Sequence, residues 1–130
     1  MQANQMPGAV PDGRDAPDKF YYGRGYLQLS WSSNYHAASQ ALFGDDRLVQ
    51  NPDQVASNED IAWATAFWFW KANVRSAPGV QNGNFAMTIL KINSMECKQG
   101  NAQAKNRFRF YGCAYKAFGV SGNPPSYTNC

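Results

Sequence analysis

The chain has 130 residues, a length that suits one domain with a single hydrophobic core. Hydrophobic residues make up 44%, charged residues 16% and aromatic residues 15%, so we expect an aromatic-rich interior and a surface that relies on Asn, Gln and Ser. The formal net charge is +3, no tract of five Lys or Arg residues occurs and no apolar run could span a bilayer, so neither nucleic acid nor a membrane is an expected partner.

Residues 1–19 have the composition of an irregular leader. Their apolar content is too thin to pack, and they contain no apolar segment typical of a signal peptide. Prolines and glycines break any regular period: Pro7, Gly8, Pro11, Gly13 and Pro17. We therefore place the folded domain at residues 20–130.

The stretch YYGRGYLQLSW, residues 21–31, raises two alternatives. Its glycines allow the backbone to turn, and residues 26–31 are expected to run extended, with Gln28 and Ser30 on one side. A glutamine amide and a serine hydroxyl on one side of a strand suit a hydrogen-bonding wall for a sugar. The other interpretation is a tight turn whose polar groups satisfy the backbone, and the pattern alone favours the turn.

Four helices follow, and the predicted fold class is mainly α with a short extended or hairpin element near residues 20–31. The first helix covers residues 35–43, is capped by Ser32, Ser33 or Asn34 and ends at Gly44. The others begin near Asn58, Asn84 and Asn101, and the last ends at Gly119.

The helix that begins near Asn58 is apolar on nearly every face. Trp63, Phe67, Trp70 and Val74 form one stripe at helical spacing. Such a cluster is tempting as a stacking platform, but the spacing favours a central, buried helix. The last helix carries a similar set of apolar residues: Ala104, Phe108, Tyr111, Tyr115 and Phe118.

Signals for metal, nucleotide and serine chemistry are missing from the sequence. His36 is the only histidine and has no acidic or cysteine neighbour at ligand spacing, so we expect no metal site and no cofactor. Cys97, Cys113 and Cys130 allow one disulfide with one thiol left over, or a bond to another polypeptide.

Taken together, four ordered motifs resemble the C-terminal portion of the catalytic domain of plant-type, family 19 chitinases. They are YYGRGYLQLSWSSNY, NPDQVASNEDIAWATAFWFW, INSMEC and RFRFYGCAYKAFGV. The resemblance covers about residues 20–130. It implies a lysozyme-like helical domain that cuts β-1,4 links of N-acetylglucosamine polymers, as an endo-acting, inverting enzyme.

Inversion needs a carboxylic acid and a carboxylate roughly 6.5–9.5 Å apart on opposite faces of the sugar. In the family both glutamates precede the YYGRG segment, the acid within a His-Glu-Thr run. This chain has no such run, and neither of its two glutamates, Glu59 and Glu96, matches that pair. We therefore expect the acid and the base to be missing from residues 1–130.

The remaining site residues are implied by the resemblance. Tyr22, Gln28 and Asn34 correspond to substrate-contacting residues, and Ser30 to a serine that helps to hold the attacking water. In the second half of the domain, Asn93 matches a substrate-contacting asparagine, Glu96 a third acidic residue, and Arg107 the arginine that pairs with cleft carboxylates. The sequence departs from the family pattern at Ser33, at Ala64 and in INSMEC, which is one residue shorter than usual.

The resemblance also pairs Cys97 with Cys130, which implies a secreted, oxidising location. Cys113 would then be free in the core or bonded to a second chain. Three functions stay open: one piece of a chitinase that acts with a second chain carrying the acid and base, a non-catalytic chitin-oligosaccharide-binding or defence protein, and a muramidase-like activity on bacterial wall.

Overall fold

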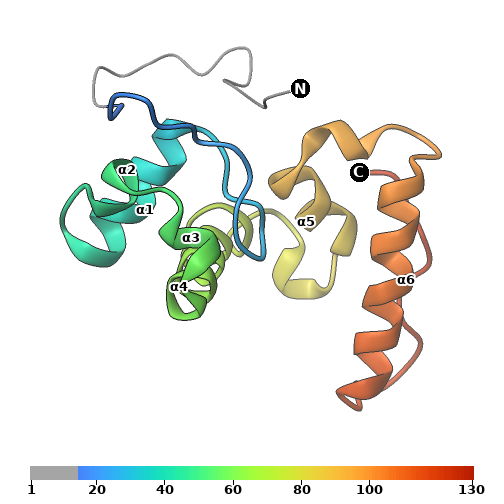
Figure 1. Ribbon diagram of the computed structural model, residues 1–130. Coiled ribbons are helices and arrows are strands. Elements are labelled where there is room, and N and C mark those ends of the chain that lie inside the picture. The colour runs from blue at the N-terminus through green and yellow to red at the C-terminus, as the bar shows by residue number, and fades with distance from the viewer. Residues whose placement is uncertain (1–14) are drawn as a thin grey trace. The chain divides into compact units, whose positions relative to one another are not determined.

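The computed structural model describes residues 15–130, which fall into two compact units (Figure 1). The division lies between Lys71 and Ala72. The described residues have one hydrophobic cluster in each unit, where the length of the chain had predicted a single core. Residues 1–14 of the predicted leader lie outside the described residues, and residues 15–19 form a turn without a helix.

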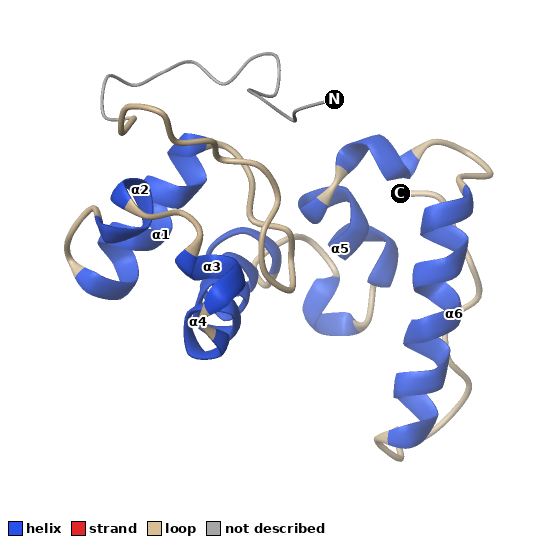
Figure 2. Cartoon of the chain, in the orientation of Figure 1, coloured by secondary structure: helices blue, strands red, loops and turns tan. Residues whose placement is uncertain are grey.

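The secondary structure of residues 15–130 is helical, with one isolated antiparallel bridge and no strand (Figure 2). None of the described helices is long and apolar enough to cross a membrane. The first unit contains α1 (Ser32–Phe43), α2 (Arg47–Gln50), α3 (Gln54–Ser57) and α4 (Glu59–Phe69), and α4 continues directly into a π-helical turn, Trp70–Val74. The mainly α class predicted from the sequence is confirmed.

Two predicted helix ends in the first unit follow local chemistry, and a third prediction does not hold. Gly44 adopts the left-handed conformation at φ 73° and ends α1, as predicted. The Asn58 side chain accepts a hydrogen bond from the Ile61 amide and begins α4, also as predicted. The predicted cap of α1 is wrong: the helix starts at Ser32 after Trp31, and no side chain caps it.

The hydrophobic cluster of the first unit joins the 21–31 loop to the short helices. Leu29 from the loop, Tyr35 from α1 and Leu48 from α2 are all buried there, together with Ala38 and Val55. Ile61, Trp68 and Phe69 of α4 pack against this cluster and remain partly exposed.

The prediction that the aromatic stripe of α4 is buried is wrong for three of its four members. Trp63 is 45% exposed, Phe67 67% and Trp70 37%, and only Val74 is fully buried. The residues of α4 that do enter the interior are small: Ala62, Thr65 and Ala66. Helical spacing places apolar residues on one face, but it does not determine what that face contacts.

The second unit contains a 3-10 turn (Val80–Asn82), α5 (Phe85–Ile92), a second 3-10 turn (Ser94–Cys97) and α6 (Ala102–Ala117). Its cluster consists of Ala86 and Ile89 of α5 with Ala104 and Phe108 of α6. Asn84, the predicted cap of α5, accepts a hydrogen bond from the Met87 amide as expected, and Asn101, near which the last helix was expected to begin, accepts one from the Ala104 amide. Phe118, the last of the apolar residues that recur at helical spacing, is 85% exposed.

A disulfide joins Cys97 to Cys130, the pairing that the family resemblance implies. It fastens the irregular C-terminal tail, in which the Tyr127 ring packs edge-on against Phe108 at a centroid distance of 5.4 Å. Cys113 is a free, exposed thiol, so of its two predicted alternatives the one that places it free in the core is wrong.

We expect a Cys130→Ser variant to lose about 3–4 kcal/mol of unfolding free energy, because the bond closes a loop of 33 residues in the unfolded chain. Equilibrium denaturation of the oxidised protein measures this loss. A Cys113→Ser variant is the control and should keep the wild-type stability. An equal loss in both variants would show that the serine substitution, not the disulfide, causes the effect.

Candidate functional site

The loop at residues 21–31 is a closed hairpin turn. Arg24 and Leu29 form an antiparallel bridge, with N to O distances of 3.1 and 2.9 Å between their backbones, and residues 25–28 form the turn between them. Gly25 has a φ of 72° and Gln28 a φ of 52°, values that a run of extended residues does not contain. The predicted extended run over residues 26–31 is therefore wrong, and the short hairpin element is confirmed.

The structure brings Gln28, Ser30 and Asn34 together through local hydrogen bonds. The Gln28 amide donates to the Gly25 carbonyl at 2.9 Å, and the Ser30 hydroxyl donates to the Gln28 carbonyl at 2.8 Å. The Asn34 amide donates to the Ser30 carbonyl, also at 2.9 Å. All three side chains thus satisfy the backbone, as the turn interpretation predicts, while their oxygen atoms can still accept hydrogen bonds.

Gly23 lets the Gln28 and Ser30 side chains lie side by side. A Cβ atom at this position would come within 3.0 Å of Gln28 Oε1 and 3.3 Å of Ser30 Oγ, closer than ordinary van der Waals contact. The two oxygen atoms therefore border the same small space beside the glycine. This proximity agrees with the expectation that Gln28 and Ser30 share a side, although a turn and not a strand produces it.

Arg24 anchors the loop to the helices. The residue is only 5% exposed, and its guanidinium donates to the Phe20 carbonyl at 2.8 Å, to the Tyr35 hydroxyl at 3.0 Å and to the Asp53 carboxylate at 2.7 Å. The ring of Tyr22 lies against the guanidinium, 3.7 Å from its central carbon. The predicted substrate residue Tyr22 thus has a packing role, and the residue is still 41% exposed.

The electrostatics of Arg24 depend on these partners. Burial alone would lower the pKa of the guanidinium, but the hydrogen bonds from Arg24 to Tyr35 and Asp53 outweigh burial and raise it. Burial has the opposite effect on Tyr35, because its charged form is an anion, and it raises the pKa of the phenol. The phenol therefore stays neutral and donates to the Tyr22 carbonyl at 2.8 Å. Sequence reasoning missed this network; the signal available was an arginine flanked by two glycines among aromatic residues.

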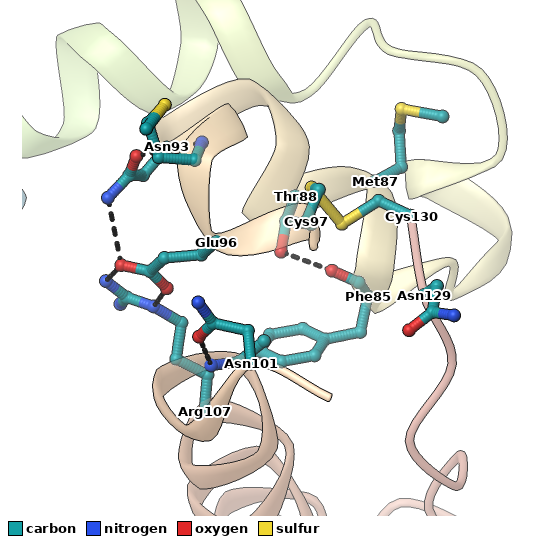
Figure 3. Close-up of a disulfide and its surroundings, with 12 residues drawn as sticks. Phe85, Met87, Thr88, Asn93, Glu96, Cys97, Asn101, Arg107, Asn129 and Cys130 are labelled. Atoms are coloured by element: carbon teal, nitrogen blue, oxygen red, sulfur yellow. Dashed lines mark hydrogen bonds and ion pairs between the residues drawn. A yellow bond between two sulfur atoms is a disulfide. The ribbon is translucent and has the colours of Figure 1, made fainter. Parts of the chain in front are cut away.

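A second group of predicted site residues lies in the second unit (Figure 3). Asn93 follows α5, Glu96 lies on the Ser94–Cys97 turn, and Arg107 projects from α6. Arg107 binds Glu96 with two nitrogens, Nε to Oε2 and Nη2 to Oε1, the second at 2.9 Å. The Asn93 amide donates to Glu96 Oε1 at 3.0 Å. The INSMEC segment, which contains Asn93 and Glu96, therefore meets Arg107 of α6, and the three residues that the resemblance implies for this unit lie together.

Glu96 is held as a carboxylate. Its hydrogen bonds from Arg107 lower the pKa of Glu96, with a smaller lowering from Asn93, although burial acts in the opposite direction. A general acid for glycoside cleavage needs the reverse, a raised pKa that keeps the proton at neutral pH. Glu96 can therefore stabilise positive charge or orient Arg107, but it is not a proton donor.

Glu59, the other glutamate, also has fixed partners. Its Oε1 accepts hydrogen bonds from the Tyr26 hydroxyl and, at 3.0 Å, from the Trp63 indole. The Tyr26 bond raises the pKa of the Tyr26 phenol. Glu59 belongs to the first unit and Glu96 to the second.

No group of three potential metal ligands occurs within residues 15–130. His36 Nδ1 lies 2.8 Å from Asp46 Oδ1, and the Gln40 amide donates to the same carboxylate oxygen at 2.8 Å. This pairing joins α1 to the loop before α2. The predicted site residues thus form two groups, one on the hairpin turn and one around Glu96.

Comparisons with known proteins agree with the motifs. The family profile described as chitinase class I, of glycoside hydrolase family 19, matches residues 9–86. The chain belongs to family 19. An endochitinase of Arabidopsis thaliana is 42% identical to it over 103 residues, which cover 78% of this chain and 35% of the relative. A basic endochitinase of Brassica napus is 44% identical over 110 residues, covering 84% of this chain and 39% of the relative.

Solved structures place this family 19 chain in the same fold. A class IV chitinase from Zea mays superposes with a TM-score of 0.75 at 35% identity, covering 89% of this chain and 55% of the other. A bacterial family 19 chitinase gives 0.70 at 39% identity, covering 85% and 56%. The lysozyme-like helical fold that the resemblance implies is confirmed, and the chain spans well under half the length of these curated relatives.

We expect an Arg24→Met variant to lose about 2–3 kcal/mol of unfolding free energy, because it leaves the Tyr35 and Phe20 groups without a buried partner. Arg24→Lys should recover little, since an ammonium does not reproduce the guanidinium fork. Urea denaturation measures both. The control is Arg47→Met, which removes an exposed pair with Asp45 and should leave the midpoint nearly unchanged. Equal losses at the two positions would contradict the anchoring role.

The lowered pKa of Glu96 predicts how stability depends on pH. Since the folded pKa lies below the unfolded value of about 4.3, the Arg107 pair stabilises the protein above that value and ceases to do so as the pH falls through the folded pKa. We expect Arg107→Ala to cost about 1–2 kcal/mol near pH 7, because the arginine is 45% exposed and water screens the pair.

The cost of Arg107→Ala should shrink below about pH 4, where Glu96 becomes protonated in the unfolded chain and then in the folded protein. Denaturation curves at several pH values measure it. Arg109→Ala is the control, because the Arg109 guanidinium donates to the Asn106 side chain, which does not titrate. A cost of Arg107→Ala that is the same at pH 3 and pH 7 would contradict the prediction.

Proposed function

We propose that this chain is the substrate-holding part of a family 19 chitinase domain that acts on β-1,4-linked N-acetylglucosamine polymers. The proposal rests on family membership and on the two groups of polar residues described above. The observation that carries it is the state of Glu96, because a carboxylate held by Arg107 suits electrostatic support and not proton donation.

Each predicted residue has a role in this proposal. Gln28 and Asn34 bind the sugar through their side-chain oxygens, and Tyr22 supports the loop and contacts the substrate. Ser30 helps to hold the attacking water, but it does not act as the base, because a serine hydroxyl is essentially never ionised near neutral pH. Around Glu96, the proposal assigns substrate contact to Asn93 and charge stabilisation to Arg107.

Hydrolysis with inversion then needs an acid and a base from outside residues 1–130. Glu96 is the only acidic residue of the second unit, and the carboxylate of Glu59 already accepts two hydrogen bonds. A carboxylic acid and a carboxylate supplied by further polypeptide would complete the inverting pair. We propose that such a polypeptide is the macromolecular partner, and that the disulfide reflects a secretory compartment.

A non-catalytic chitin-oligosaccharide-binding or defence protein is the second candidate. The same observation favours it, since both glutamates of the chain are held by neighbouring side chains. The two candidates differ in what a completed domain does: the first hydrolyses chitin, and the second only binds it.

The test is calorimetric titration of the 130-residue chain with N-acetylglucosamine oligomers, followed by an assay for hydrolysis products. We expect binding without hydrolysis. Gln28→Ala and Asn34→Ala should each weaken binding about fivefold to tenfold, the effect of one lost hydrogen bond. Gln50→Ala, an exposed glutamine on α2, is the matched control and should bind normally. Absence of binding by the wild-type chain would refute the proposal. Hydrolysis by the chain alone would refute the claim that the acid and the base lie outside residues 1–130.

A further inference from the structure

Positive charge is concentrated in the second unit. Residues 72–130 carry seven Lys or Arg residues and one acidic residue, Glu96, a formal charge of +6, while residues 1–71 carry five Lys or Arg residues and eight acidic ones. Glu96 is already paired with Arg107, so it neutralises none of the other six cations. The uncharged polymer of the proposed function makes no use of this surplus, which is available to an anionic ligand.

Three of these cations form a row along α6, which we call the cationic stripe: Lys105, Arg109 and Lys116. At 3.6 residues per turn, their positions fall within about 40° of one another around the helix axis and extend over about 17 Å of its length. All three residues are exposed. Within residues 15–130 none of the three pairs with a carboxylate, and Arg109 donates to the neutral Asn106 side chain.

The cationic stripe is separate from the Glu96 group. Arg107, which binds Glu96, lies about 160° or more around α6 from each member of the stripe. Phe110, an exposed apolar residue, lies about 100° or more away on the same helix. The C-terminal tail returns along α6 (Figure 1), where Tyr127 packs against Phe108. A ligand can therefore lie on the stripe without covering the Glu96 group.

Local contacts restrain two of the three cations. The guanidinium carbon of Arg109 lies 4.7 Å from the ring centroid of Phe110, and the Lys105 ammonium lies 5.8 Å from that of Tyr127. Restrained side chains lose less entropy when a ligand binds. Lys105 and Arg109 are also one turn apart, a spacing at which like charges repel, so an anion along the stripe would relieve a repulsion within the helix.

We propose that the cationic stripe binds a polysaccharide that carries carboxylate groups on successive sugars. A straight row of cations matches a linear chain of anions, and both lysine and arginine donate charge-assisted hydrogen bonds to carboxylates. The only other α6 residue on this face between Lys105 and Lys116 is Gly112. The stripe therefore has neither rings on which the bases of single-stranded nucleic acid stack nor apolar side chains that insert into a bilayer.

The experiment is calorimetric titration of the full 130-residue chain with sodium polygalacturonate at an ionic strength of about 0.1 M. The methyl ester of the same polymer, which has the same backbone without the charges, is the ligand control. We expect saturable binding of polygalacturonate and none of the ester. Raising the ionic strength to about 1 M shortens the Debye length from about 10 Å to about 3 Å and should weaken the binding at least about tenfold.

Two charge-matched double variants locate the binding surface. Arg109→Gln/Lys116→Gln should weaken binding of polygalacturonate about fivefold to tenfold, the effect of two lost contacts between exposed charges. Arg75→Gln/Lys91→Gln removes one arginine and one lysine from exposed positions of the same unit outside α6, and it should change the affinity less than about twofold. Equal weakening by the two variants would show that net charge and not the stripe attracts the polymer, and it would overturn the proposal.

A charge-preserving variant controls for damage to the fold. Arg109→Lys/Lys116→Arg keeps both charges and should bind polygalacturonate as the wild-type chain does. Loss of binding in this variant would overturn the proposal, as would absence of binding by the wild-type chain. Tighter binding to DNA or to phosphatidylserine vesicles, at equal concentrations of anionic groups, would overturn the choice of a polysaccharide.

The inference does not rest on the proposed function, and titration with N-acetylglucosamine oligomers separates the two. Arg109→Gln/Lys116→Gln should bind these uncharged oligomers as the wild-type chain does. Weaker binding by this variant would make the stripe part of the oligomer site and overturn the inference. Failure of the wild-type chain to bind oligomers would refute the proposed function, while the titration with polygalacturonate would still report on the stripe.

Discussion

The fork of hydrogen bonds from Arg24 determines the shape of the first unit's polar loop. One buried guanidinium reaches the loop backbone at Phe20, the α1 side chain Tyr35 and the Asp53 carboxylate. A buried cation is tolerated only when its donors are paired, so the three partners must stay in place together. The hydrogen bonds of Arg24 therefore fix the position of the hairpin turn that carries Gln28 relative to α1 and to Asp53.

The second unit also depends on one arginine–carboxylate pair, but its buried group is the anion and not the cation. There a carboxylate, Glu96, is the group in the interior, and Arg107 supplies a two-nitrogen fork from a partly exposed position. Arginine suits both places because its planar fork stays charged and pairs with carboxylate in two parallel bonds. Each unit thus presents polar side chains supported by one arginine, and in the second unit that arginine lowers the pKa of Glu96, the reverse of what a general acid for glycoside cleavage needs.

Where sequence reasoning succeeded, the cause is local. The helix starts near Asn58, Asn84 and Asn101 and the stop at Gly44 depend on a few consecutive residues, and each forms as predicted. Where it failed, the deciding partner is distant in sequence. The expected extended run became a turn, in which the Gln28 backbone is left-handed, because the bridge between Arg24 and Leu29 closes it.

The aromatic stripe of α4 shows the same limit. Its period predicts one apolar face correctly, but burial is a property of what packs against that face, and Phe67 remains 67% exposed. The sequence by itself determined the helical class and the family, since these follow from ordered motifs and local capping. Only the tertiary structure decided that Arg24 anchors the loop, that Glu96 is held as a carboxylate and that the aromatic face of α4 is exposed, because each depends on groups that only folding brings into contact.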